Sequence, residues 1–491
     1  MDDEPASSSG EGRALGRRFL VGTFLLGAGN SAVSVFNLVV GILLARLLGP
    51  EEFGLFAFVF GINELISIIA AFSLGSALIQ TREESQTLYD TAFAMSLGLG
   101  LVTIAVGFAL APILSSQRGP EAAAFLIVLS SSRIFRIAAQ VPRAKLERTL
   151  RYNVVTRNIV LEMSLPNILA LSLAWWGFGA WALVLRDAGV SILTFVLESV
   201  SSRYWFRREW SREAYARLMK FAKPMFVARS IDILVERVDR VAVGAFLGNA
   251  AAGLLDRGRF LADMGLYVMR PVERASLNLL SRVQDDAYRS SRSYSLVNFF
   301  LVRMTFAGAI VLFLAPESTL RLLLGEEWVA AAPALRWLAV HAAIYPIYSM
   351  VKVLVIARNK VGRIARISAV QAVILIPGTL TAAYFGSAAD VAAVVALTTC
   401  VGALLGTVWS RDLATVSYRQ LFGTPLLSAA VTVALFTAWS AVGIEPQNVW
   451  LVEPFAVGGI FVMLIGLLEG RLILAEFRYL RSQFAGGATS A

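Results

Sequence analysis

The chain has 491 residues, of which 57% are hydrophobic and only 16% are charged, and its mean hydropathy is +0.68. A soluble domain carries about 25% charged residues, so this composition places the chain among membrane proteins. The single cysteine, Cys400, excludes an intramolecular disulfide or a thiolate cluster, and the single histidine, His341, argues against histidine-based metal or triad chemistry. We therefore expect no catalytic residue, no bound metal and no cofactor.

Several long segments contain no Asp, Glu, Lys or Arg, the clearest being 19–45, 91–117, 367–389, 391–410 and 421–444. About 20 apolar residues cross a bilayer as a helix, and continuous apolar runs favour helices over the alternating strands of a barrel. Read through to its end, the sequence predicts an all-α polytopic membrane protein with fourteen transmembrane helices. Their expected limits are 19–45, 53–79, 88–115, 121–142, 152–174, 177–201, 217–247, 250–281, 295–324, 327–357, 360–386, 388–410, 421–443 and 448–471.

Basic residues predict the orientation of these helices, because cytoplasmic connections retain Lys and Arg. With the N-terminus inside, alternate connections are rich in both, whereas the seven opposite connections carry only Arg46, Arg118 and Arg321. Both termini are therefore expected in the cytoplasm, with the chain in the inner membrane. The net charge of +10 follows mostly from this topology, so we do not expect a nucleic-acid partner.

A short pattern, L-G-x-x-x-x-G-L, occurs at Leu48–Leu55 and again at Leu247–Leu254, six helices later. Gly is expected to end one helix and begin the next in a tight turn. Six helices of separation give both copies the same orientation, which predicts a parallel repeat of two six-helix lobes, the architecture of alternating-access transporters. The expected domains are a cytoplasmic tail at 1–18, an N-lobe at 19–201, a cytoplasmic linker at 202–216, a C-lobe at 217–415, two further helices at 416–472 and a second tail at 473–491.

Two predicted helices, 217–247 and 250–281, concentrate ionisable residues at helical spacing, each on a single face. A charged residue facing lipid at mid-bilayer costs on the order of 3 kcal/mol, so these stripes are expected to face a hydrated cavity between the lobes. The candidate substrate-binding residues are Arg229, Arg240, Arg259, Arg270 and Arg274, with Asn30 and Asn37 on the first helix. The candidates for charge pairing or ion coupling are Asp232, Glu236, Asp239, Asp256, Asp263 and Glu64.

Structural Arg–carboxylate pairing is the alternative for any one of these residues, since charges within the membrane commonly pair with one another. Arginine suits phosphate as well, because its planar guanidinium makes bidentate hydrogen bonds. On that interpretation the arginines bind substrate, and the nearby acids hold them in place, temper the affinity or bind a coupling cation.

The residues Leu43-Leu44-Ala45-Arg46-Leu47-Leu48-Gly49-Pro50-Glu51-Glu52-Phe53-Gly54-Leu55 resemble the polysaccharide transporter (oligosaccharide flippase) family of the multidrug/oligosaccharidyl-lipid/polysaccharide exporter superfamily. Shorter matches are Ala77-Leu78-Ile79-Gln80 and Asp239-Arg240-Val241-Ala242-Val243-Gly244, and the resemblance covers about residues 19–415. It implies a flippase that moves a polyprenyl-pyrophosphate-linked oligosaccharide repeat unit to the outer face of the inner membrane by alternating access, for surface or exopolysaccharide synthesis. The implied partners are the lipid-linked oligosaccharide, the bilayer, a polysaccharide polymerase, a chain-length regulator and a coupling ion, H⁺ or Na⁺.

Three other functions would require sequence features different from those of a flippase. A cation-coupled multidrug exporter of the same superfamily is expected to have an acidic or aromatic pocket, whereas the predicted spans here carry more Arg than carboxylate. A membrane-embedded polymerase or glycosyltransferase needs a sizeable external loop, and every external connection is short. A lipid-facing scaffold has no use for charged helix faces.

Overall fold

The computed structural model describes residues 33–81, 84–149, 151–283, 286–360, 362–441 and 449–486, and every regular element in these ranges is a helix. Ten of the described helical segments are long and apolar enough to cross a membrane. The helix Val33–Leu47 is shorter within the described residues, and the charge-bearing helices of the sixth, seventh and eighth expected spans are not among the ten. The all-helical membrane fold is confirmed, and the total of fourteen spans stays a prediction.

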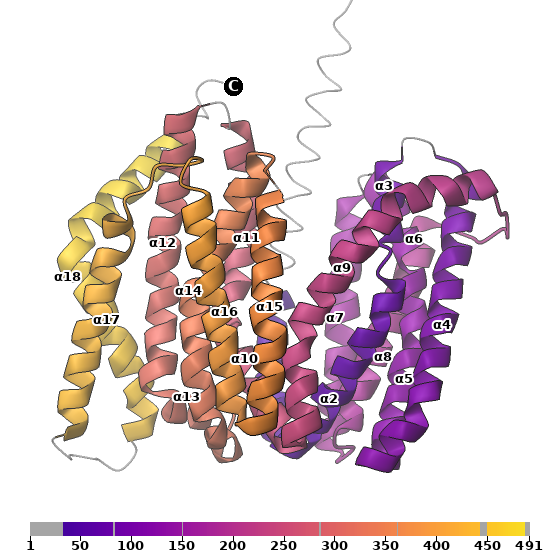
Figure 1. Cartoon of the computed structure of the whole chain (residues 1–491), viewed down its shortest axis with the longest axis horizontal. Coiled ribbons are helices and arrows are strands. Elements are labelled where there is room, and N and C mark those ends of the chain that lie inside the picture. Colours follow the sequence, from indigo (N-terminus) through magenta and orange to yellow (C-terminus); the bar gives the residue numbers. More distant parts are fainter. Residues whose placement is uncertain are drawn as a thin grey trace, which may run out of the picture. The chain divides into compact units, whose positions relative to one another are not determined.

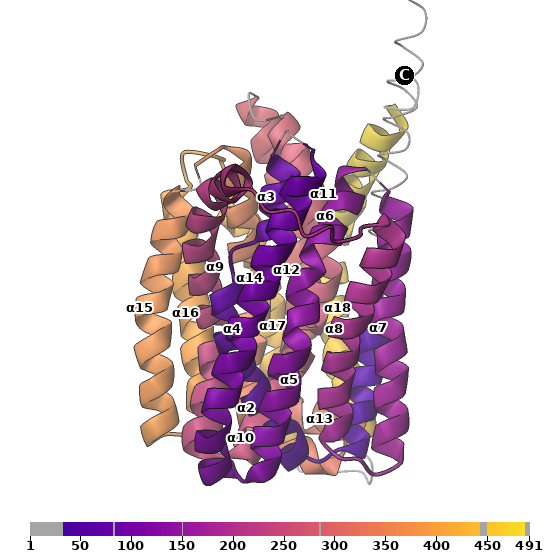
Figure 2. The ribbon, with the colours of Figure 1, turned by 90° about the vertical axis from the view of Figure 1, so that its right-hand side faces the viewer.

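The chain divides into two compact units, Met1–Gly253 and Leu254–Ala491. The first unit contains Val33–Leu47 and the elements shown in the indigo-to-magenta half of Figure 1. These are α2 (Pro50–Ile66), η1 (Ser67–Ala70), α3 (Leu74–Gln80), α4 (Gln86–Arg118), α5 (Pro120–Ala138), α6 (Gln140–Arg148), α7 (Tyr152–Trp175), α8 (Trp181–Ser202), α9 (Arg212–Leu247) and the first turn of α10 (Asn249–Ala262). Figure 2 shows α4, α5, α7 and α8 running roughly parallel to one axis.

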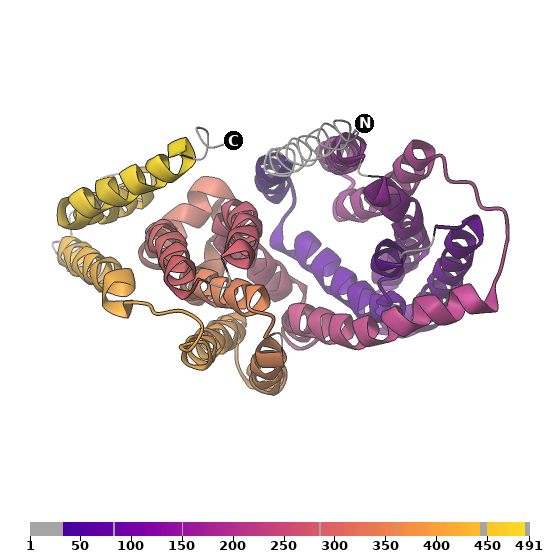
Figure 3. The ribbon, with the colours of Figure 1, turned by 90° about the horizontal axis from the view of Figure 1, so that it is seen from above.

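The second unit continues from α10 to the end of the described chain. It contains α11 (Met264–Arg282), α12 (Ala287–Leu314), α13 (Pro316–Leu323), η2 (Glu326–Ala331), α14 (Ala332–Ala357), α15 (Gly362–Phe385), α16 (Ala388–Trp409), α17 (Tyr418–Ala441) and α18 (Val449–Gly486). Helix α14 is the most buried of them and packs against α11, α12 and α16. Helices α17 and α18 pack against each other and against α12, at the edge of this unit in Figure 3.

Local sequence explains where many of these helices begin. Ser85 and Ser211 accept hydrogen bonds from the main-chain N–H groups of Leu88 and Ala214, which caps α4 and α9. Proline occupies the first position of α2, α5 and α13, where its missing N–H costs no helical hydrogen bond. Ser387 and Asp390 form a capping box at the start of α16.

Several expected spans are interrupted rather than continuous. The second breaks between η1 and α3, where Ser73 adopts a left-handed conformation with φ 50°. The eighth breaks at Asp263, between α10 and α11, and the ninth ends its long helix before Pro316 begins α13. Of the two predicted turn glycines, Gly248 needs its glycine conformation (φ 94°), but Gly49 has an ordinary φ of −75° and serves as the N-cap of α2.

Helix α9 belongs to the first compact unit and packs against α2. In Figure 1 its first turns run across the top of that unit, and the helix then bends to lie beside α2. Pro224 lies inside the helix and supplies a cause for the bend, because proline removes one main-chain hydrogen bond. The predicted division into lobes at 19–201 and 217–415 stays a prediction.

Candidate functional site

The main charged cluster of the first unit joins three helices through Glu64. This carboxylate on α2 accepts a hydrogen bond from Nη2 of Arg133 on α5, and its Oε2 lies 3.5 Å from Nη2 of Arg237 on α9. The side chains of Arg133, Glu64 and Arg237 are 7%, 16% and 23% exposed. A single buried carboxylate on α2 therefore lies between guanidinium groups on α5 and α9.

This cluster carries more positive than negative charge. Nε of Arg133 and Nε of Arg237 are both buried without a hydrogen-bond partner, and the Arg237 guanidinium also lies 5.8 Å from the centre of the Phe60 ring. Buried donors without acceptors are costly, and a buried charge without a full counter-charge is costlier still. An anion with several oxygens would satisfy both the unused donors and the excess charge.

Small residues let α2 and α9 approach closely enough to build this cluster. A Cβ on Gly61 would lie 2.8 Å from Cγ2 of Val241, and one on Gly244 would lie 2.3 Å from the Phe58 ring. Close backbone contact of this kind is the usual role of glycine between membrane helices. One position from Glu64, Asn63 is fully buried, and its Oδ1 accepts a hydrogen bond from Ser130.

The predicted residues of α9 do not share one environment. Arg229 and Glu236 are exposed and Arg240 is partly buried, whereas Asp239 is 2% exposed and accepts a hydrogen bond from the main-chain N–H of Arg240. The side chain of Asp232 lies outside the described residues. Sequence reasoning missed Arg237, the α9 residue that contacts Glu64. An available signal was the lone Glu64 in an otherwise apolar span, because an isolated charge in the membrane needs a counter-charge.

The predicted charges around α10 occur in pairs. Arg257 donates to Asp256 at 2.7 Å, and Nε of Arg259 lies 3.8 Å from Asp263. Asp263 also lies 3.9 Å from Nε2 of the buried His341 on α14, whose Nδ1 is 2.7 Å from the Thr399 hydroxyl. The side chains of Arg270 and Arg274 lie outside the described residues.

Of the two asparagines predicted on the first helix, the structure describes Asn37 but not Asn30. Asn37 accepts a 2.7 Å hydrogen bond from Nδ2 of Asn167, a buried residue of α7. The partner of Asn37 therefore comes from α7, a helix on which the sequence analysis placed no candidate residue. Asn30 lies outside the described residues.

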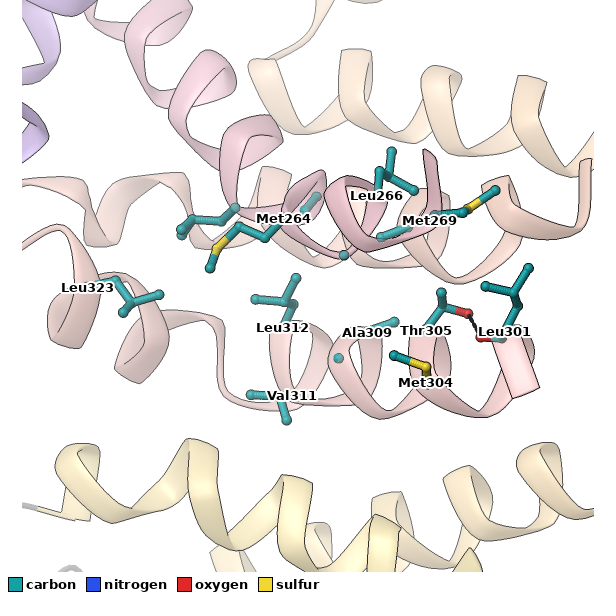
Figure 4. Close-up of a pocket in the computed structure, with 15 residues that line it drawn as sticks. Met264, Leu266, Met269, Leu301, Met304, Thr305, Ala309, Val311, Leu312 and Leu323 are labelled. Carbon is teal, nitrogen blue, oxygen red and sulfur yellow. Dashed lines mark hydrogen bonds between the residues drawn. The ribbon is translucent and has the colours of Figure 1, made fainter. Parts of the chain in front are cut away.

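An apolar cavity of about 330 Å³ lies within the second unit, between α11 and α12. Figure 4 shows Met264, Leu266 and Met269 on one side of it and Ala309 and Leu312 on the other. Among the lining residues that the structure describes, Thr305 has the one polar side chain, and its hydroxyl donates to the carbonyl of Leu301. The lining therefore offers an apolar ligand contact surface, and flexible methionines can adapt to its shape.

Solved structures of two transporter classes share this fold. The chain superposes on the lipid II flippase MurJ in an inward closed conformation with a TM-score of 0.68, 12% identity and coverage of 93% of this chain and 99% of MurJ. A multidrug resistance MATE family transporter of the MOP superfamily, inward-facing, gives a TM-score of 0.63 at 16% identity, covering 77% of this chain and 94% of the other. At these low identities the likeness shows that the chain shares the fold of these two transporters.

Sequence comparison then identifies the family. Residues 43–333 match the family model described as polysaccharide biosynthesis protein, so the chain belongs to that family, and the resemblance predicted from the motif beginning at Leu43 is confirmed. The chain is 25% identical to the succinoglycan biosynthesis transport protein ExoT of Rhizobium meliloti (strain 1021) over 309 residues, which are 62% of each protein. It is 21% identical to the lipopolysaccharide biosynthesis protein WzxC of Escherichia coli (strain K12) over 394 residues, 78% of this chain and 79% of WzxC. The match thus spans less than two thirds of the length of ExoT.

Proposed function

We propose that this protein flips a polyprenyl-pyrophosphate-linked oligosaccharide from the cytoplasmic to the outer face of the inner membrane by alternating access. Family membership and relatives named for polysaccharide transport and biosynthesis support a substrate of this class. The observation that carries the proposal is the cationic cluster of Glu64 on α2, Arg133 on α5 and Arg237 on α9, where α2 and α5 belong to segments apolar enough to cross a membrane.

A pyrophosphate group matches what this cluster lacks. Its oxygens accept several hydrogen bonds at once, and a guanidinium can offer two parallel donors to them. Because Glu64 already neutralises one of the two charges, the cluster attracts an anion without binding it irreversibly, and a transporter must release what it carries. Arg229, Arg240, Arg259, Arg270 and Arg274 remain proposed contributors to substrate binding, with Asn30 and Asn37 beside them.

The apolar cavity between α11 and α12, within the second unit, has a lining suited to an isoprenoid chain. The Thr305 hydroxyl in that lining already donates to the carbonyl of Leu301, so it needs no partner from the ligand. The proposal further includes cytoplasmic termini, a coupling ion (H⁺ or Na⁺), and a polymerase and chain-length regulator that receive the flipped unit. Asp232, Glu236, Asp239, Asp256 and Asp263 are the proposed partners that hold the arginines or bind the ion.

The test measures glycan export and protein abundance together in a host whose own flippase gene has been deleted and whose glycan this chain restores. Arg237→Ala is expected to lower export at least about tenfold, because a hydrogen bond to a charged group contributes about 1.5–3 kcal/mol, while the protein still inserts and accumulates. Arg303→Ala, which breaks a buried pair with Glu469 in the second unit, is the matched control and is expected to lower abundance instead.

Normal export by Arg237→Ala, by Arg133→Ala and by alanine variants of the five arginines predicted from the sequence would refute the cationic-site mechanism. Multidrug export is the second function that this fold supports, because a multidrug resistance MATE family transporter shares it. Expression that protects cells from cationic drugs, with no export of glycan, would favour it.

A further inference from the structure

A second buried charged cluster lies in the first unit, on α6, α7 and α8. The side chains of Glu162 on α7 and Glu198 on α8 are 4% and 0% exposed. Arg143 on α6 lies between them, with Nη2 3.4 Å from Oε1 of Glu162 and Nε 3.5 Å from Oε1 of Glu198. The charge balance is the reverse of that around Glu64, since here two buried carboxylates share a single guanidinium.

The oxygens of these carboxylates are incompletely satisfied. Oε2 of Glu162 and both oxygens of Glu198 are buried without a hydrogen-bond partner. Within the described ranges, Arg143 is the one basic side chain at ion-pair distance from either glutamate. Ionised carboxylates normally accept several hydrogen bonds when buried, so two fully ionised groups do not suit this environment.

The other polar groups around Glu198 do not supply the missing positive charge. Helix α6 contributes Glu147, itself an acid, which is 37% exposed and 4.0 Å from Arg143. Helix α7 contributes Asn158, whose Nδ2 donates to Leu197 O and Ser201 Oγ. It also contributes Arg157, whose Nη2 donates to Asn158 Oδ1 and Ser201 Oγ and not to either glutamate. Helix α5 faces α8 with Arg136, which pairs with Asp187, about three turns away along α8.

We infer that Glu162 and Glu198 together bind one exchangeable proton, held on Glu198, beside the Arg143 guanidinium. Glu162 is the ionised partner because its Oε1 accepts a hydrogen bond from Arg143. With the proton bound, one carboxylate balances one guanidinium. Without it, two buried negative charges face one positive charge, and like charges oppose the second ionisation.

The proton has a route to solvent, because the Arg143 side chain is 31% exposed and Glu198 lies within the last two turns of α8. Release breaks the O–H bond of Glu198, leaves the electron pair on the carboxylate and transfers the proton to water at that end of the helix. A role of this pair in coupling proton movement to transport rests on the proposed flippase function. The binding of a proton by the pair does not depend on that function.

Infrared difference spectroscopy of the purified full-length protein in lipid nanodiscs tests the assignment without any substrate. A protonated carboxyl band is expected to titrate between about pH 5 and about pH 9, and Glu198→Gln should abolish it. Glu147→Gln is the matched control, since it changes a half-exposed carboxylate beside the same arginine and should leave the band intact. Glutamine is isosteric with the protonated acid, so Glu198→Gln should unfold at a temperature no lower than the wild type.

An unchanged band in Glu198→Gln, or its loss in Glu147→Gln, would overturn the proton site. Replacing choline by sodium at constant pH and ionic strength should not shift the titration, and a shift would identify a sodium site instead. Export by Glu198→Gln in the complemented host separates the two proposals. Loss of export supports coupling, whereas wild-type export with the band abolished removes the coupling role and leaves the flippase proposal intact.

Discussion

Gly54 on α2 and Gly253 on α10, both in the first unit, lie where the backbones of the two helices touch. The missing side chain of each glycine leaves room for the backbone of the other helix. A Cβ on Gly54 would lie 1.6 Å from the carbonyl oxygen of Asn249, and one on Gly253 would lie 2.1 Å from that of Pro50. The relationship is reciprocal, because Pro50 and Asn249 are equivalent positions in the two copies of L-G-x-x-x-x-G-L, as are the two glycines. The repeated motif therefore encodes a contact between its own two copies.

Gly54→Ala is expected to damage the protein severely, because its methyl group would overlap a main-chain oxygen that cannot rotate away. Overpacking typically costs about 1–3 kcal/mol, and a backbone clash should reach or exceed the upper end. Thermal unfolding of the detergent-purified variant measures the loss. Gly98→Ala in α4 is the control, since nothing lies within 4 Å of its Cβ position, and it should unfold like the wild type. Equal stability of the two variants would contradict the contact.

Arg303→Ala should lower the free energy of unfolding by about 3–5 kcal/mol, because it leaves Glu469 buried without its partner. The pair joins α12 to α18, and Arg303 also donates to the carbonyls of Phe299 and Gln420. Adding Glu469→Leu should recover much of the loss by removing the orphaned carboxylate. Abundance in membranes and the unfolding temperature are the measurements, and a double variant no better than the single one would contradict the pairing.

Arg118→Ala should destabilise the C-terminal end of α9. The Arg118 guanidinium donates to the carbonyls of Gly244 and Ala245. These are among the last carbonyls of α9, where the helix has no following turn whose N–H groups could bond to them. A loss of about 1–2 kcal/mol is expected, measured by thermal unfolding. Arg321→Ala removes an exposed pair with Glu326 and should leave the unfolding temperature close to that of the wild type; a larger loss at Arg321 than at Arg118 would contradict this ranking.

Asp412, in the connection between α16 and α17, should make a small pH-dependent contribution to stability. Hydrogen bonds from Arg363 hold the pKa of this carboxyl well below its usual range. Its stabilisation is therefore present above the unfolded-state pKa of about 3.9 and is lost as the pH falls through the lower folded-state pKa.

Asp412→Asn should accordingly unfold at a slightly lower temperature than the wild type near neutral pH, and the difference should disappear in strong acid. The effect is small because the Asp412 side chain is 53% exposed, so solvent screens the interaction. Unfolding temperatures of both proteins across the acid range provide the measurement. A difference that grows as the pH falls would contradict the sign.

The helices could be predicted from sequence because about 20 apolar residues in a row have few other stable arrangements in a membrane. The breaks were harder, because the apolar run through Ser73 predicts a continuous helix although Ser73 adopts a left-handed conformation. The substrate-binding and coupling residues stay predictions. Helical periodicity finds residues on one face of one helix, whereas Glu64 with Arg237, and Glu162 with Glu198, meet across helices far apart in sequence.

Helix α18 runs without interruption from Val449 to Gly486. At 1.5 Å per residue it is about 57 Å long, roughly twice the hydrocarbon thickness of a bilayer. Arg292 of α12 forms an ion pair with Glu476, near the end of the candidate membrane span Trp450–Arg478. A helical protein fused in register to the last turns of α18 would therefore project from the membrane as a stiff extension. In electron cryo-microscopy, such an extension would help to align the particle images of this small protein.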